Sequence, residues 1–216
     1  MDNIALYIDA DNINSEHFPN IYKEIKKKGR LIIKCVYGDW TSKKMDKWKN
    51  KTTEFGLEPK TAFNLPGKNS SDMLLTVDIM EDIYTKSHIN TFIILSCDSD
   101  YIPVIKKVRA KGNRVICIGY LKSTSPSLVK SCDEFISIDT LIKHKVKSKH
   151  SDKKIELKNL IVSILDNGSD IDLGNLKLVI LNEDPSFDYR NYGVSSMTKL
   201  INLYPKTFGL YKEKNT

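Results

Sequence analysis

Acidic side chains stand where two strongly apolar runs of the sequence end. Asp9 directly follows the run IALYI, and Asp98 follows TFIILS after a single cysteine. A third acid, Asp72, begins an amphipathic segment after the run GKNSS. In an open parallel sheet the ligand site lies outside the carboxyl ends of the strands, and the following helices begin along the same edge. We therefore expect the three carboxylates to meet at one edge of a sheet.

Carboxylates that converge on one point repel one another unless a cation or shared protons neutralise them. Oxygen ligands with open positions favour Mg²⁺ or Mn²⁺, which tolerate few protein carboxylates and keep water or phosphate oxygens. Such a hard cation suits phosphodiester hydrolysis, because it activates water and stabilises charge that develops on the phosphate. Each aspartate alone has a structural explanation as a helix or turn cap, so the prediction depends on the set.

The elements that must position these acids alternate along residues 1–142. Apolar, near-continuous runs predict strands, and the amphipathic stretches between them predict helices. This alternation is typical of a parallel sheet covered on both faces, so we predict a three-layer α/β/α domain. The expected strands are 4–8, 31–38, 58–63, 91–96, 114–120 and 134–138, and the expected helices are 15–28, 41–55, 71–88, 99–111 and a short helix after Pro126.

A stretch rich in lysine and tryptophan, GDWTSKKMDKWKNK, follows the second expected strand. On a helix, Lys43 and Lys47 share a face. Together with Lys44 and with Trp40, near the carboxyl end of the strand, they would form one wall of a nucleic-acid groove. The alternative is that Trp48 belongs to the core and the lysines only solubilise the surface. Two further basic candidates lie in loops expected at the same edge: Lys68 and Lys122.

The acidic blocks together resemble a known family. They lie within LYIDADNIN, GKNSSDMLLTVDIMEDI and FIILSCDSDYIPVIKKVRAKGNRVICIGY, and the run SPSLVKSCDEFISID follows them. Residues 1–142 thereby resemble the NYN domain of the PIN-like nuclease superfamily, in a combination of motifs that phosphatases and glycosyltransferases with a lone DxD do not share. The resemblance implies a PIN-like fold and a ribonuclease, expected to be an endonuclease, that depends on Mg²⁺ or Mn²⁺.

The resemblance also implies roles for individual residues. Asp9 matches the acid after the first strand, Asp72 the acid at the helix start, and Asp98 the acid after the fourth strand. These three are the expected metal ligands. Asn12 and Asp100 match secondary polar positions that orient water or support the ligands, and they complete the expected catalytic set.

Four other polar residues belong to the same blocks. Ser70 and Ser96 are expected to donate hydrogen bonds to phosphate oxygens, whereas Asp11 is left open because it can also face a turn. Asp78 matches a family position, yet it follows Asp72 by six residues, about 240° around a helix. We therefore interpret Asp78 as structural or peripheral.

The last part of the sequence predicts a separate helical domain. Amphipathic helices are expected at 155–167, after Asp172, and at 194–203. This region resembles the LOTUS or OST-HTH domain, a small all-α winged-helix-like module that implies RNA, or a helicase or other RNA-processing protein, as a partner. The resemblance depends mainly on apolar residues: Leu176, Leu181, Phe187, Tyr189, Tyr192, Leu200 and Phe208, with Pro185, Asp188, Arg190, Gly193 and Pro205.

The charge of the chain is unevenly distributed. Residues 143–154 hold six lysines and one aspartate, which accounts for most of the net charge of +7. We expect this segment to be a basic linker between a domain at 1–142 and a domain at 155–216. The last domain is slightly acidic, which favours base stacking or protein contact over a phosphate-dominated interaction.

Composition excludes several classes of protein. No run approaches the ~18–20 apolar residues of a membrane span, and the amino-terminal sequence lacks the pattern of a secretory signal. The four cysteines show no CxxC spacing and are expected to be reduced, so we expect a cytoplasmic protein without a membrane partner. Two other functions stay open, an RNA-binding adaptor of the same fold with little catalysis and a Mg²⁺-dependent nucleotide phosphatase. The sequence does not determine the oligomeric state.

Overall fold

The computed structural model describes residues 1–61, 70–142, 151–165 and 170–210. The chain divides into two compact units, Met1–Ile142 and Lys143–Thr216. Each unit has its own hydrophobic core.

The first unit is built on a six-stranded sheet whose strand order is β3-β2-β1-β4-β5-β6. All neighbouring strands are parallel. The chain moves outward from β1 to β3 and then returns to place β4 beside β1, so the strand order reverses between β1 and β4. Ligand sites in such sheets lie at the carboxyl ends of the strands where this reversal occurs. The strands are β1 (Asp2–Asp9), β2 (Gly29–Gly38), β3 (Glu58–Thr61), β4 (Thr91–Leu95), β5 (Arg114–Gly119) and β6 (Glu134–Ser137).

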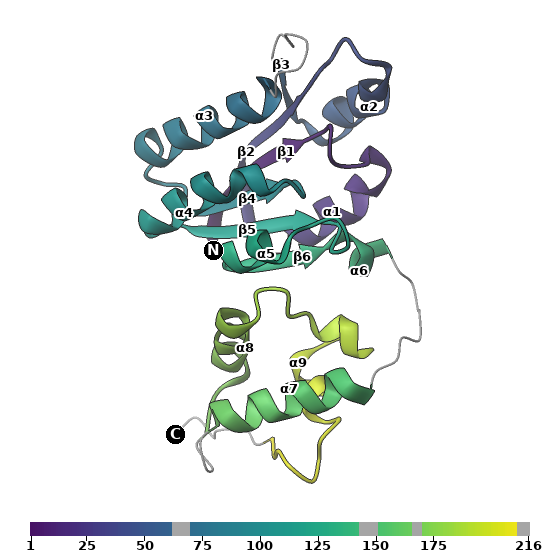
Figure 1. Cartoon of the computed structure of the whole chain (residues 1–216), viewed down its shortest axis with the longest axis vertical. Helices are drawn as coiled ribbons and strands as arrows, with labels where there is room; N and C mark the ends of the chain where they lie inside the picture. Colours follow the sequence, from purple (N-terminus) through teal and green to yellow (C-terminus); the bar gives the residue numbers. More distant parts are fainter. Residues whose placement is uncertain (62–69, 143–150, 166–169, 211–216) are drawn as a thin grey trace. The chain divides into compact units, whose positions relative to one another are not determined.

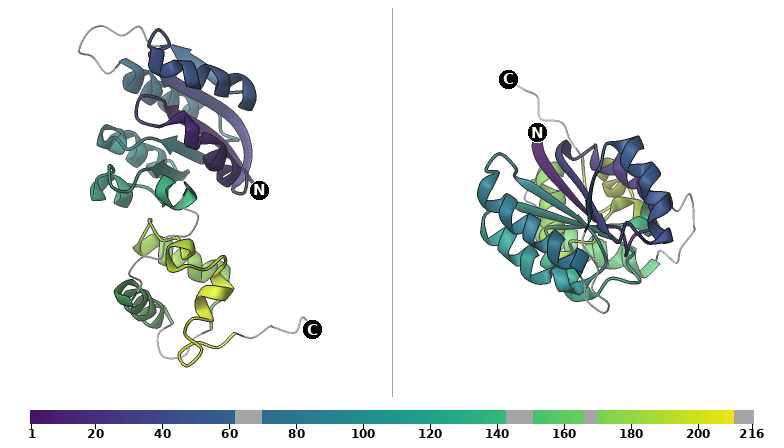
Figure 2. Two further views of the ribbon diagram at one scale, coloured as in Figure 1. Left: turned by 90° about the vertical axis from the view of Figure 1, so that its right-hand side faces the viewer. Right: turned by 90° about the horizontal axis from the view of Figure 1, so that it is seen from above.

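Helices cover both faces of this sheet, which confirms the predicted three-layer α/β/α architecture (Figure 1 and Figure 2). One face carries α1 (Phe18–Ile25), α2 (Asp46–Phe55) and α6 (Ile138–Ile142). The other face carries α3 (Ser70–Thr85), α4 (Ile102–Ala110) and α5 (Pro126–Ser131). Because both faces are covered, the central strands are apolar along nearly their whole length.

Three of the expected helices begin with a tighter turn than predicted. A short 3₁₀ helix precedes α1, α2 and α4: η1 (Ser15–His17), η2 (Lys43–Met45) and η3 (Ser99–Tyr101). Each begins at a capping side chain that accepts a backbone N–H two residues on, namely Asn14, Ser42 and Asp98. Such local bonds favour a turn over a regular helix start. The third expected strand, 58–63, ends at Thr61, and its last two residues lie outside the described part of the chain.

The described residues of the second unit form three α-helices and a 3₁₀ turn, with no strand. These elements are α7 (Ser151–Ile164), α8 (Leu173–Glu183), η4 (Tyr189–Tyr192) and α9 (Met197–Ile201). The core contains Leu176, Leu181, Phe187 and Leu200, with Tyr192 half-buried against it, so these residues of the resemblance are packing residues.

The expected basic linker, 143–154, overlaps a helix at its end. Its last four residues are the start of α7, which begins at Ser151. The sequence Ser-Asp at this point is typical of helix starts, and the lysine-rich composition hid it. Residues 143–150 lie outside the described part of the chain. Among the described residues, no helix is long and apolar enough to cross a membrane, and the four cysteines are free.

Candidate active site

Asp9 is the last residue of β1 and lies buried at the point where the strand order reverses. Its Oδ1 accepts the backbone N–H groups of Asp11 at 3.2 Å and Asn12 at 3.3 Å. Its Oδ2 accepts the Asn12 amide at 2.6 Å and the Ser96 hydroxyl at 2.8 Å, and the Tyr101 hydroxyl oxygen lies 3.3 Å from it. Both oxygens are therefore held in place by the turn after β1 and by the block that follows β4.

The electrostatic state of Asp9 shows how unfavourable this environment is for a bare charge. Burial raises the pKa of the Asp9 carboxyl to about 6, and the negative charges of Asp72 and Asp11 act in the same direction. The hydrogen bonds from Asn12 and Ser96 oppose that increase in the pKa. Hydrogen bonds thus hold the Asp9 side chain in place, although burial disfavours its charged form. This combination is typical of functional sites.

Asp72 reaches the same place from another layer, because it lies in the first turn of α3. The Tyr101 hydroxyl donates to its Oδ1 at 2.8 Å. Burial raises the pKa of Asp72, and the negative charges of Asp98, Asp11 and Asp100 add to this, whereas the bond from Tyr101 opposes it. The structure thus brings the predicted acids Asp9 and Asp72 together through one tyrosine hydroxyl.

Asp98 and Asp100 lie in the turn after β4. Asp98 is half-buried; its backbone N–H donates to Ser96 Oγ at 3.1 Å, and its Oδ1 accepts the N–H of Asp100 at 2.9 Å. Asp100 is exposed, and both carboxylates act on Asp72 through their charge. Asp11, which the sequence left open, belongs to the same group, since the buried Ser71 contacts its Oδ2 at 3.4 Å.

The donor set fits a hard, partly hydrated cation. Among the described residues, no lysine or arginine forms an ion pair with any of these five aspartates. In the same part of the chain, no three acidic, histidine or cysteine side chains come close enough to hold one ion. Mg²⁺ is usually bound through one or two carboxylates and keeps several waters, so the carboxylate chemistry fits this ion without a closed protein cage.

The two serines expected to contact phosphate differ in their contacts. Ser96 has a single hydroxyl proton, which it donates to Asp9 while its oxygen accepts from Asp98 N–H. It therefore organises the acidic residues. Ser70 is half-buried at the first position of α3, and its neighbour Ser71 makes the contact with Asp11 instead.

The expected nucleic-acid residues that the structure describes differ in exposure. Lys43, Lys44 and Lys122 are exposed, and Lys47 is exposed in an ion pair with Glu16 at 2.5 Å. Lys68 lies outside the described residues.

The two tryptophans have structural contacts. Trp40 is half-buried, and its indole N–H donates to the Lys60 carbonyl at 2.9 Å, so it is less available for stacking than expected. Trp48 belongs to the core beside Phe18, in agreement with the structural alternative, and its indole N–H is 3.3 Å from the Ile13 carbonyl.

Sequence reasoning missed Tyr101 and Ser71 as parts of the site. The ring of Tyr101 belongs to the apolar core, so its position in the block SCDSDY predicts packing and gives no indication of its hydroxyl. Ser71 differs from Ser70 only by one step of the helix, a rotation that the sequence does not fix at the start of a helix.

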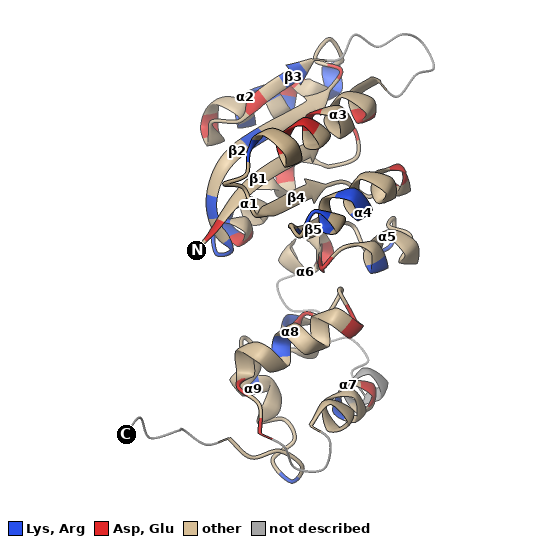
Figure 3. Ribbon diagram, turned by 90° about the vertical axis from the view of Figure 1, so that its left-hand side faces the viewer, with Lys and Arg blue, Asp and Glu red and all other residues tan. Residues whose placement is uncertain are grey.

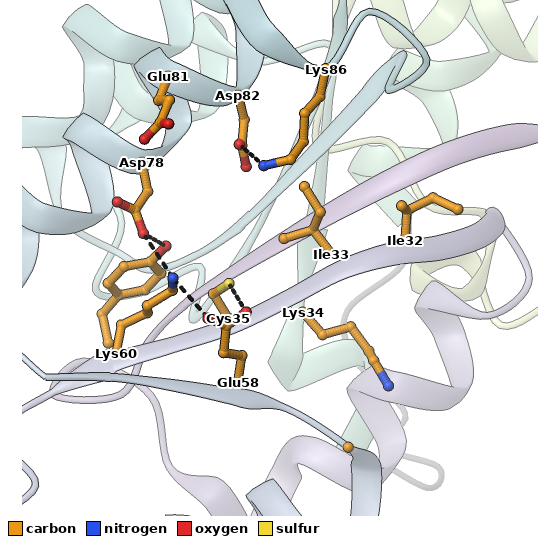
Figure 4. Close-up of a pocket in the computed structure, with 12 residues that line it drawn as sticks. Ile32, Ile33, Lys34, Cys35, Glu58, Lys60, Asp78, Glu81, Asp82 and Lys86 are labelled. Carbon is orange, nitrogen blue, oxygen red and sulfur yellow. Dashed lines mark hydrogen bonds and ion pairs between the residues drawn. The ribbon is translucent and has the colours of Figure 1, made fainter.

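A second charged region lies farther along α3, in a pocket of about 460 Å³ between α3, β2 and β3 (Figure 4). Asp78 accepts the Tyr37 hydroxyl at 2.8 Å and lies 3.8 Å from Lys60 Nζ. Asp82 accepts the Tyr7 hydroxyl at 2.6 Å and pairs with Lys86. The interpretation of Asp78 as structural agrees with these bonds, since it points into this pocket. Charge colouring shows acids on α3 and lysines on the neighbouring α4 (Figure 3).

Comparison with known proteins gives matches to both units. The profile of the NYN domain matches residues 3–139, and that of the OST-HTH/LOTUS domain matches residues 149–216. An uncharacterized protein from Methanocaldococcus jannaschii is 28% identical over 139 residues, which are 62% of this chain and 55% of that protein. This chain thus spans about half the length of that relative.

One solved structure supports the fold alone. It is a crystal structure of a protein of unknown function from Vibrio parahaemolyticus, with a TM-score of 0.56 and 17% identity. The match covers 64% of this chain and 93% of the other.

Proposed function

Because the chain belongs to the NYN domain family, we propose that it is a ribonuclease that depends on Mg²⁺ or Mn²⁺ and cleaves within RNA. Asp9, Asp72 and Asp98 would supply the carboxylates for the metal ion, directly or through its bound waters. The observation that carries the proposal is the group of aspartates at the strand reversal, which no described lysine or arginine neutralises. Such a group requires a cation or shared protons, and the proposal assigns this role to a cation.

The bound ion would supply Lewis-acid stabilisation of the phosphate and a water of lowered pKa. The chain itself supplies position and order. Asn12 and Ser96 fix both the orientation and the charged form of Asp9, because their hydrogen bonds lower its pKa against the effect of burial. Asp100 and Asp11 extend the negative field toward solvent, where it repels RNA phosphates until a cation is present.

Exposed lysines at the edge of the sheet would hold the RNA backbone. Lys43 and Lys44 in η2 and Lys122 after β5 follow the carboxyl ends of their strands, as the acidic residues do. Contacts of this kind are independent of base sequence and weaken with salt. Trp40 would stack on an RNA base only through the exposed part of its ring.

The test is a cleavage assay on single-stranded and hairpin RNA with Mg²⁺, with Mn²⁺ and with a chelator. We expect cleavage with either metal, none with the chelator, and none in Asp98→Asn. We call the group of Asp9, Asp11, Asp72, Asp98 and Asp100 the acidic edge. The matched control is Asp78→Asn, an equivalent change on α3 outside the acidic edge. Unchanged cleavage by Asp98→Asn would disprove the proposed metal site.

One observation favours a second candidate, an RNA-binding adaptor. Among the described residues no three acidic groups are close enough to hold one ion, so the site as it stands is not a complete cage. In this case the protein binds RNA and leaves it intact under every metal condition. The same assay separates the two functions if it is paired with a binding measurement on the same RNA.

We propose that the OST-HTH/LOTUS unit targets the nuclease to RNA or to a helicase or similar RNA-processing protein. Because α7 begins at Ser151, the informative comparison is between chains that end at 142, at 150 and at 216. Residues 143–150 add four lysines. If the chain ending at 150 binds RNA as tightly as the full chain, the basic segment rather than the helical unit supplies the contacts.

A further inference from the structure

Tyr101 connects two acidic residues that come from different layers of the fold. It ends the 3₁₀ turn η3, which turns its ring back into the core, where it is 1% exposed. Its hydroxyl lies at the edge of that core, 2.8 Å from Asp72 Oδ1 and 3.3 Å from Asp9 Oδ2. Packing therefore fixes the ring, and the ring fixes the place of the hydroxyl.

The two carboxylates depend on this hydroxyl to different degrees. Asp9 has four other hydrogen bonds, from Asp11, Asn12 and Ser96, so its position does not require Tyr101. For Asp72, the Tyr101 hydroxyl is the one donor found among the described residues. Asp72 is half-buried and is repelled by neighbouring acids, so without that bond its side chain is free to turn toward solvent.

We infer that Tyr101 is a positioning residue whose hydroxyl holds the Asp72 carboxylate beside Asp9, an inference that rests on the proposed metal-dependent function. The hydroxyl has one proton, and the shorter distance assigns that proton to Asp72. The donor is a neutral phenol, which keeps its proton near neutral pH. A lysine here would neutralise the carboxylates, whereas a tyrosine orders them and leaves their charge for a cation.

The same helix provides a matched comparison. Tyr7, Tyr37 and Tyr101 each donate to an aspartate of α3, namely Asp82, Asp78 and Asp72. The Tyr37–Asp78 bond has the same length, 2.8 Å, and joins the same helix to the sheet. A general loosening of α3 should follow from losing either bond. A specific effect on the acidic edge should follow from losing Tyr101 alone.

The test is Mn²⁺ binding by the full chain, measured by calorimetry and by electron paramagnetic resonance. Tyr101→Phe keeps the buried ring and removes the hydroxyl, and it should weaken Mn²⁺ binding roughly 10- to 100-fold, the loss typical of groups that orient metal ligands. Tyr37→Phe should bind within about twofold of the wild type. Equal losses in the two variants, or no loss in Tyr101→Phe, overturn the inference.

A double-mutant cycle shows whether Tyr101 acts through Asp72. Asp72→Asn weakens binding by itself, and adding Tyr101→Phe should then change affinity by less than about twofold. A full additional loss overturns the inference, and thermal melts verify that each variant is folded. Wild-type protein that binds no Mn²⁺ overturns the proposed metal function as well, whereas tight binding by both wild type and Tyr101→Phe removes only the role of Tyr101.

Discussion

Helix α3 carries aspartates into two regions that use the same residue types for different ends. At its start, Asp72 joins Asp9 and three further acids without a described basic partner. About two to three turns farther along, Asp78 and Asp82 meet the tyrosine hydroxyls of β2 and β1 and the lysines Lys60 and Lys86. We call the second region closed, because its aspartates have lysine neighbours. We call the first region open, because its aspartates have no basic partner among the described residues. The carboxylates of the second region fasten the helix to the sheet, and those of the first region are the ones that we propose bind a cation.

The largest effect should come from neutralising the open region. Asp9→Asn should lower RNA cleavage by more than about 100-fold, a loss beyond that of groups that only orient ligands. Its stability should hold or rise near pH 8, because a carboxyl whose pKa is raised to about 6 by burial destabilises the fold when ionised. Single-turnover cleavage and urea unfolding measure the two quantities. A variant that loses activity because it unfolds would contradict this separation.

Divalent metal should stabilise the first unit by binding at the open region and not at the closed one. At a Mn²⁺ concentration a hundredfold above Kd, the first unit gains about 2.7 kcal/mol, and its Tm rises by several degrees. Asp72→Asn should lose most of that rise, whereas Asp78→Asn should keep it. Thermal melts with and without Mn²⁺, with chelator as the baseline, check this. Equal shifts in both variants would mean that the ion binds elsewhere.

The closed region should show the opposite profile. Tyr7→Phe removes the donor at 2.6 Å from the buried Asp82 and should lower the free energy of unfolding by about 1–3 kcal/mol. Cleavage by the folded fraction should be unchanged, because neither residue touches the acidic edge. Urea unfolding gives the first value and initial cleavage rates give the second. A cleavage defect without a stability defect would place Asp82 in the functional site.

The smallest effects belong to the surface lysines around the open region. Lys43→Ala and Lys44→Ala should each weaken RNA binding a few-fold and reduce the salt slope by about 0.7 for a single strand. Lys27→Ala is the control, because Lys27 is exposed before the amino end of β2 and is paired with Glu24 at 2.7 Å. Binding titrations between 50 and 200 mM salt, roughly the useful range, provide both values. An equal effect of Lys27→Ala would mean that net charge alone determines binding.

The sequence predicted the sheet and the positions of the acidic residues, but not the side-chain contacts that distinguish the two regions. Apolar runs and their spacing predicted the strands other than β3, because buried parallel strands are continuous in hydrophobicity. The edge strand β3 is mostly exposed and gave a weaker pattern. The positions of Asp9, Asp72 and Asp98 followed from that sheet, because strand ends and helix starts share an edge. Asp78 was separated from Asp72 by helical geometry alone, and its bond to Tyr37 agrees with that reasoning.

What the sequence could not show depends on side-chain direction. Ser96 was expected to face phosphate, yet its proton goes to Asp9, and a single hydroxyl gives no sign of which partner it will choose. Tyr101 is identified as a core residue by its type, and the 3₁₀ turn that brings its hydroxyl to Asp72 depends on a local cap. The start of α7 was hidden because lysines are common in both linkers and helices.

The reversal of strand order also sets when the acidic edge can exist during synthesis. Asp9 and the Ser96 that orients it are 87 residues apart, and β1 gains β4 as a neighbour only after β2, β3 and α3 have been made. Contacts of such long sequence separation form late and slowly. A nascent chain that ends before β4 carries Asp9 and Asp72 but neither Ser96 nor Tyr101. The site therefore stays unassembled on the ribosome until most of the first unit has emerged. During that time the nascent chain lies near the messenger RNA that encodes it.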